Sequence, residues 1–277
     1  MNAIPTERQS PAGGLIFRHT NRRKGRHAAV TTENSSMEHL CYGRIILDSE
    51  TPRVAFEAGA SEIGLICLSG EGVVRVGDEA HTLGRYDAIY IPRDSSVEVT
   101  TESGVDFVEC SARVESRFPL QIVRYADVER DASLKFKTGG PASTRTINIL
   151  IGKNVEAGRI LAGVTTSEPG HWTSWPPHEH AAMLEEIYVY YDMPPPAFGA
   201  QFVYDDAEQP EFVGIVRDGD AALMPRGFHP NVSIPGHTIS FVWMMAARRE
   251  VVDREFGVVR VQPGFDNGGS GLEASRK

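Results

Sequence analysis

The residues best suited to chemistry are histidines and glutamates in the second half of the chain, within and after the stretch WTSWPPHEHAAMLEEIYVYY. His178 and His180 stand two apart, so on an extended strand both imidazoles project from the same face. A carboxylate follows at Glu185 or Glu186, and His229 comes later, after a Pro-x-Gly turn. Three imidazoles and one carboxylate suit a divalent transition metal that keeps open positions. The pattern predicts a metal site for Zn, Mn, Fe or Ni.

The choice between the two glutamates rests on the alternation of a strand. Glu186 would share one face with Tyr188 and Tyr190, whereas Glu185 would share the opposite face with aliphatic residues. The first face is typical of a polar cavity wall and the second of sheet packing. We therefore favour Glu186 as the ligand, and we predict that the two tyrosines act in catalysis by orienting the substrate. No single residue is identified as a general base.

The elements that must position these residues are short. Apolar runs separated by Gly, Pro, Asp and Ser occupy residues 64–114 and 147–247 and predict β-strands of ordinary length. Many short strands at near-regular spacing indicate an all-β sandwich or barrel. The charged segment 123–142, which contains GGP, is the predicted linker, with one helical turn around residues 126–130.

An internal repeat divides the chain. DAIYIPRDSSVEV, which begins at Asp87, aligns without gaps with DAALMPRGFHPNV, which begins at Asp220. The alignment places Pro92 on Pro225, Ser96 on His229 and, upstream, Glu62 on Glu186. Two copies predict two similar barrels, one of them without metal ligands. We predict a scaffold barrel over residues 1–125, a metal-binding barrel over residues 126–262 and a disordered tail over residues 263–277.

Composition excludes several classes of protein. The 277 residues are 41% hydrophobic and 23% charged, which argues against disorder and fibrous folds. The net charge of −9 argues against nucleic acid or an anionic membrane as a partner. Without a membrane-length apolar run or a signal-peptide core, we expect a cytoplasmic protein. We expect Cys41, Cys67 and Cys110 to be small buried hydrophobes.

The motifs resemble a known family. The HxH pair, the glutamate and the series Gly219, Pro225, Gly227 and His229 are similar to the two cupin motifs. The strings WTSWPPHEH and EEIYVYYDM resemble the uronate isomerase branch of the bicupins, which are proteins with two tandem jelly-roll-like cupin barrels. That branch comprises 5-deoxy-glucuronate isomerase of inositol breakdown and a ketol-isomerase of pectin breakdown. PPHEH and LEEIYVY match the first more closely.

The resemblance implies a metal-dependent aldose–ketose isomerase acting on a deoxy-uronate, with 5-deoxy-glucuronate as the expected substrate. The alternatives are a cupin dioxygenase with a redox-active metal and a non-catalytic sugar-binding cupin. A small sugar acid is the expected partner, and a homo-oligomer is possible because exposed sheet edges invite pairing.

The carboxylate of such a substrate needs a cationic side chain, which arginine supplies best. The candidates are Arg145, Lys153, Arg159, Arg217 and Arg226, of which we take Arg145 and Arg217 as the predicted substrate-binding residues.

Overall fold

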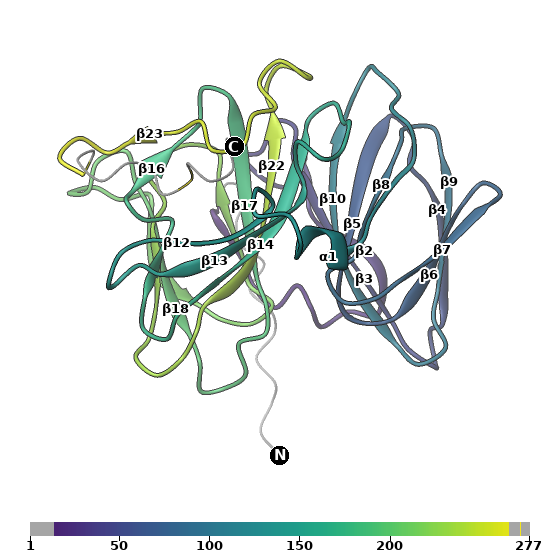
Figure 1. The fold of residues 1–277 in the computed structure, drawn as a ribbon, viewed down its shortest axis with the longest axis horizontal. Helices are drawn as coiled ribbons and strands as arrows, with labels where there is room; N and C mark the ends of the chain where they lie inside the picture. The colour runs from purple at the N-terminus through teal and green to yellow at the C-terminus, as the bar shows by residue number, and fades with distance from the viewer. Residues whose placement is uncertain (1–13, 266–271, 273–277) are drawn as a thin grey trace.

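The chain forms two antiparallel β-barrels that lie side by side (Figure 1). The structure, a computed structural model, describes residues 14–265 and residue 272. Within that part of the chain the single helix is α1 (Tyr125–Val128), which lies in the predicted linker, and no helix is long and apolar enough to cross a membrane. The predicted all-β fold class is confirmed.

The N-terminal barrel is built from two sheets. The larger has six strands in the order β11 (Gln121–Val123), β8 (Ala88–Ile91), β5 (Ser61–Gly70), β10 (Val105–Arg113), β3 (Cys41–Leu47) and β2 (Gly25–Val30). The smaller has four strands in the order β4 (Arg53–Glu57), β9 (Ser96–Thr100), β6 (Gly72–Val76) and β7 (Glu79–Leu83). All neighbouring strands pair antiparallel, which short turns between consecutive strands allow.

The C-terminal barrel has one large sheet and two small ones. The large sheet has the order β1 (Ile16–Phe17), β20 (Ala221–Met224), β17 (Leu184–Tyr190), β22 (Ser240–Ala247), β14 (Ile160–Ser167), β13 (Arg145–Ile151) and β12 (Lys135–Thr138). Facing it are β15 (Trp172–Thr173), β21 (Asn231–Ser233), β18 (Gly199–Val203) and β19 (Phe212–Val216). A two-stranded pair, β16 (His178–Glu179) with β23 (Arg260–Val261), completes it.

The large sheets of the two barrels pack back to back, which buries their strands on both faces. On β5, Leu65 and Cys67 point into the core of the N-terminal barrel, while Ile66 and Leu68 join the larger apolar cluster. That larger cluster continues into the second barrel through β13, β14, β17 and β22. This explains why the runs in the sequence are continuously apolar rather than alternating, since a sheet covered on both sides needs apolar residues on both faces.

The N-terminal segment of the described chain also joins the two barrels. Strand β1 pairs with β20, so the start of the described chain belongs to the large sheet of the C-terminal barrel. Arg18 extends this contact through an ion pair of 2.6 Å with the buried carboxylate of Asp220. The observed pairing therefore departs from a division in which residues 1–125 form only the first barrel. The exact domain limits stay a prediction.

Strand pairing sets the register of the internal repeat. In the N-terminal barrel Ile63 pairs with Ile91, which precedes the repeated proline. In the C-terminal barrel Glu186 pairs with Met224, which precedes the corresponding proline, Pro225. Aligning the two prolines therefore places Ile63, and not Glu62, on Glu186. The predicted match of Glu62 with Glu186 is wrong by one residue. Both faces of β5 are apolar, so its sequence does not show which residues face the barrel interior.

Glu62 instead corresponds to Glu185, and both carboxylates lie at the interface between the barrels. Glu62 accepts the backbone N–H groups of residues 158–160 at 2.6–2.8 Å. Glu185 accepts those of residues 38–40, which belong to the other barrel. Each barrel thus anchors a loop of its neighbour with one buried carboxylate, and these charge-assisted hydrogen bonds are stronger than neutral ones.

The cysteines differ in their burial. Cys67 and Cys110 are buried, and burial raises the pKa of the Cys67 thiol to about 12. Cys41 is only partly buried, in contrast to the prediction, because it is the first residue of β3 at the end of the sheet.

The predicted disordered tail lies mostly outside the described residues. Of its described members, Phe265 packs edge-on against Trp175 at 5.3 Å between ring centroids, and Leu272 is buried. For Leu272 the expectation of disorder is therefore wrong, because its side chain is covered by the C-terminal barrel's apolar cluster.

Candidate active site

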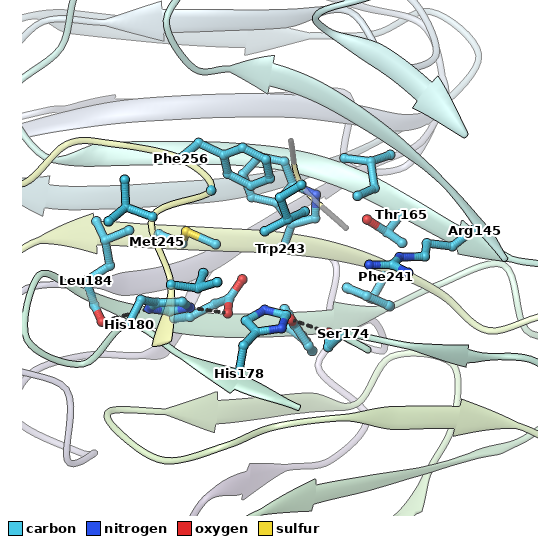
Figure 2. Close-up of a pocket in the computed structure, with 17 residues that line it drawn as sticks. Arg145, Thr165, Ser174, His178, His180, Leu184, Phe241, Trp243, Met245 and Phe256 are labelled. Carbon is cyan, nitrogen blue, oxygen red and sulfur yellow. Dashed lines mark hydrogen bonds and ion pairs between the residues drawn. The ribbon is translucent and has the colours of Figure 1, made fainter. Parts of the chain in front are cut away.

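A cavity lies inside the C-terminal barrel, against the inner face of the large sheet (Figure 2). Strands β13, β14, β17 and β22 contribute its floor through alternate residues, since only every second side chain of a strand faces inward. Polar and charged groups gather on this wall among aromatic and aliphatic ones. The polar lining residues are Arg145, Thr165, Ser174, His178, His180, Glu186 and Tyr188.

Three of the predicted ligands form a tight cluster beside the cavity. The Nε2 atom of His180 is 2.9 Å from Oε2 of Glu186, and Nε2 of His229 is 3.2 Å from the same oxygen. The ring of His178 lies next to them, with its centroid 5.1 Å from that of His229 and 6.5 Å from that of His180. All four residues are buried. The structure thus brings the four predicted ligands together.

The hydrogen bonds of the three Nδ1 atoms show which nitrogen of each histidine carries the proton. The Nδ1 atoms of His178, His180 and His229 lie 2.8–3.0 Å from the backbone carbonyls of Pro176, Leu184 and Gly227, respectively. A carbonyl oxygen only accepts, so each Nδ1 must carry the proton and donate it. Nε2 is therefore the nitrogen that each ring presents to the cluster, and such backbone partners fix the orientation of metal-binding histidines.

The donor set fits a divalent transition metal. Nε2 of His229 is buried and makes no well-formed hydrogen bond in the described structure, although it faces the carboxylate of Glu186. A buried polar atom without a partner is costly unless another group satisfies it. Imidazole and carboxylate ligands are those that Zn, Mn, Fe and Ni accept. The cluster of His180, Glu186 and His229 could therefore hold an ion, with His178 adjacent.

The charges of the cluster support this assignment. Burial, with a smaller contribution from His229, lowers the pKa of His178 to about 3, so its ring is neutral at neutral pH. Burial alone would raise the pKa of Glu186, but the hydrogen bond and charge of His180 and the contact with His229 outweigh it and lower that pKa. Glu186 is therefore a carboxylate, which is the form that binds metal.

Glu185 occupies the opposite face of β17. Its side chain is fully buried at the interface between the barrels, where it accepts three backbone N–H groups. It therefore points away from the cavity, as strand alternation requires.

The two predicted tyrosines have different surroundings. Tyr188 lines the cavity, and its hydroxyl is 2.7 Å from the hydroxyl of Ser174. Tyr190 does not line it, and its hydroxyl donates to the side chain of Gln201. Gln201 in turn donates to the backbone carbonyl of His229 at 3.1 Å. The prediction that both tyrosines face the cavity is wrong for Tyr190, because its hydroxyl is taken up by Gln201 and its ring packs against Phe241.

Of the two cationic residues predicted to bind the substrate, only one lines the cavity. Arg145 is 2% exposed and lines the cavity. Arg217 is exposed in the turn before β20 and does not line the cavity, which contradicts its predicted role. The reason is alternation, since the preceding residue, Val216, is buried and directs Arg217 outward. The remaining candidates outside the described lining are Lys153, Arg159 and Arg226.

Sequence reasoning missed the segment that closes the cavity. Residues 254–261, here called the cover segment, contribute Phe256 and residues 257–259 to the lining, and Leu272 joins them. Strand β23 holds this segment by pairing with β16, the strand of His178. The inward residues of β22, among them Trp243, were also missed. Their signal was the pair of large aromatic side chains two residues apart in β22, Phe241 and Trp243, whereas nothing local marks the cover segment.

The same positions in the N-terminal barrel are apolar. Ile63, Leu65 and Cys67 follow each other along the inner face of β5, where β17 carries Glu186, Tyr188 and Tyr190. Of the residues that the structure describes, the one group of potential metal ligands is that of the C-terminal barrel. The absence of a metal in the first barrel stays a prediction.

Fold and site together define a two-barrel cupin. An IolB-like protein from Salmonella typhimurium LT2 has a solved structure that matches with a TM-score of 0.80 and 20% identity, over 92% of this chain and 98% of that one. A deletion mutant of Bacillus subtilis oxalate decarboxylase matches with a TM-score of 0.60 and 14% identity, over 87% of this chain and 79% of that one. The predicted bicupin fold is confirmed.

The chain belongs to the KduI/IolB family, whose model matches residues 15–257. A curated relative, 5-deoxy-glucuronate isomerase from Bacillus velezensis, is 26% identical over 240 residues, which covers 78% of this chain and 84% of the relative. The resemblance noted in the sequence is confirmed.

Proposed function

We propose that this protein is a metal-dependent aldose–ketose isomerase that converts 5-deoxy-glucuronate into 5-dehydro-2-deoxy-gluconate. One observation carries the proposal. Three histidines with their Nδ1 atoms bonded to backbone carbonyls surround a buried glutamate at a cavity that also contains an arginine. Membership of the KduI/IolB family supports this choice among the reactions that such a site could perform.

The proposed ligands are His178, His180, Glu186 and His229, and the proposed ion is Zn, Mn, Fe or Ni. A bound divalent ion supplies Lewis acidity, which polarises a carbonyl and the hydroxyl beside it. The cluster lies at one end of the cavity, so it defines where the reacting end of the sugar acid binds (Figure 2).

The side chains around the cluster bind and orient the substrate. Burial, followed by the charge of Glu186, raises the pKa of Tyr188 well above its usual value, so its hydroxyl stays protonated at neutral pH. Tyr188 therefore acts as a hydroxyl that orients the substrate and not as a base. Arg145 binds the carboxylate, for which the planar guanidinium is suited. The apolar residues that the cover segment contributes to the lining, Phe256, Val258 and Val259, exclude water on that side of the cavity.

The test is an assay of the purified protein with 5-deoxy-glucuronate, with and without oxygen, after loading with zinc. Isomerisation requires no electron acceptor, so we expect equal turnover in both conditions. In heavy water, deuterium should enter the product, because the proton passes through an acid–base group of the enzyme. Turnover should disappear on chelation and return with added metal.

A panel of other uronates serves as the control for substrate choice. Strict dependence on oxygen would contradict the proposal in favour of an oxygenase. Binding of the sugar acid without any conversion by the metal-loaded protein would contradict it in favour of a binding protein.

A further inference from the structure

A buried hydrogen-bond donor in the cavity has no partner. Trp243 on β22 lines the cavity and is 3% exposed, and its Nε1 atom has no hydrogen-bond partner in the described structure. An indole N–H can only donate, and buried tryptophans ordinarily find an acceptor for it. Since an unmade buried hydrogen bond is unfavourable, this donor indicates that the cavity's occupant brings the acceptor.

The indole is held rigidly. Gly163 lies against the ring, where a Cβ atom would come within 2.3 Å of Cζ2 of the indole, so only glycine leaves room for it. Phe256 also stacks on the ring, with centroids 4.6 Å apart and planes inclined by 25°. A donor fixed in this way loses little freedom when it binds, which favours precise orientation of a ligand.

The donor lies between the two groups assigned to the ends of the substrate. Strand register places Trp243 opposite Tyr188, while the next inward residue of β22, Met245, is opposite Glu186. Trp243 is therefore two residues along β22 from the position that pairs with the ligand Glu186. Figure 2 shows its indole between Met245 and Arg145.

We propose that Trp243 donates its indole N–H to an oxygen of the carbon chain of the sugar acid and so fixes the position of that chain relative to the metal ligands. This inference rests on the proposed function. The acceptor is a hydroxyl or carbonyl oxygen between the reacting end and the carboxylate. Trp243 is thus a substrate-binding residue that determines which hydroxylated chains align with the cluster.

Nuclear magnetic resonance of the zinc-loaded protein with ¹⁵N-labelled tryptophan tests the contact directly. The chain has three tryptophans, so single Trp→Phe variants at positions 172, 175 and 243 assign the indole signals. On addition of 5-deoxy-glucuronate, the Nε1–H signal of Trp243 should move downfield, as expected for a new hydrogen bond. An unmoved Trp243 signal in protein that turns over the substrate overturns the inference, since the donor then has at most a water partner.

Steady-state kinetics of two tryptophan variants provide a second test. Trp243→Phe keeps an aromatic ring against Phe256 but removes the donor, so kcat/KM should fall roughly 10- to 100-fold with bound zinc unchanged. Trp172→Phe is the matched control, because Trp172 stacks on Phe202 outside the described cavity lining, and its kcat/KM should stay at the wild-type value.

The outcomes separate the two proposals. Wild-type kcat/KM in Trp243→Phe, with the native protein active, overturns the role of Trp243 and leaves the proposed function standing. A zinc-loaded native protein that neither binds nor isomerises 5-deoxy-glucuronate overturns both. If Trp243→Phe does not fold, the resonance experiment on the native protein decides.

Discussion

At the scale of single residues, two tyrosines on the same strand face are expected to behave differently. Tyr188 lines the cavity, so Tyr188→Phe removes a hydroxyl that orients the substrate. We expect kcat/KM to fall by about fivefold to thirtyfold, since one hydrogen bond contributes on the order of 1–2 kcal/mol. Bound metal, measured by elemental analysis, should not change.

Tyr190→Phe is the matched comparison. Its hydroxyl bonds to Gln201, which also holds the backbone of His229, so the loss should lower the melting temperature. Turnover per bound metal ion should stay at the wild-type value. Equal losses of turnover in the two variants, with stability unaffected, would show that Tyr190 reaches the substrate after all.

At the scale of elements, strand β17 separates two glutamates by a single residue. Glu186→Gln should lower metal affinity at least as far as the roughly 10- to 100-fold typical of losing a supporting partner of a ligand. Glu185→Gln should leave bound metal unchanged but destabilise the protein by about 2–4 kcal/mol, because an amide cannot accept all three backbone N–H groups at the interface. Metal titration and thermal melting measure the two effects.

Glu98→Gln is the control for the loss of a carboxylate. Glu98 pairs with Arg53, which is 65% exposed, and exposed pairs contribute little. The assignment of the two faces would be wrong if Glu185→Gln lost its metal while melting as the wild type does.

At the scale of the whole molecule, the shared core predicts that both barrels unfold together. One apolar cluster runs from the large sheet of the first barrel into that of the second, and Glu62 and Glu185 tie each barrel to the other. Calorimetry should therefore show a single transition with equal calorimetric and van't Hoff enthalpies. Metal at a hundred times its dissociation constant should stabilise that whole transition by about 2.7 kcal/mol.

Chelation provides the corresponding control. It should lower the single melting temperature without splitting the transition. Two separate transitions, of which only one responds to metal, would show that the barrels are independent and that the cluster between them contributes little to cooperativity.

Local patterns were enough for the all-β class, for the doubling of the fold and for the cluster around Glu186. Side chains two apart on a strand share a face whatever the rest of the chain does, so His178, His180 and the choice between Glu185 and Glu186 could be predicted from alternation. The spacing of the turn before His229 is equally local. These features depend on the geometry of a strand or a turn and not on what lies across the barrel.

Contacts between distant segments could be decided only by the tertiary structure. The sequence offered Arg145 and Arg217 as equals, and the packing of β13 under the cavity includes only the first in its lining. Because β5 is apolar on both faces, its sequence could not show that Glu62 corresponds to Glu185 in the second barrel. Nothing in the local sequence marks the cover segment or the unpartnered N–H of Trp243, because both arise from contacts between segments that are distant in the sequence.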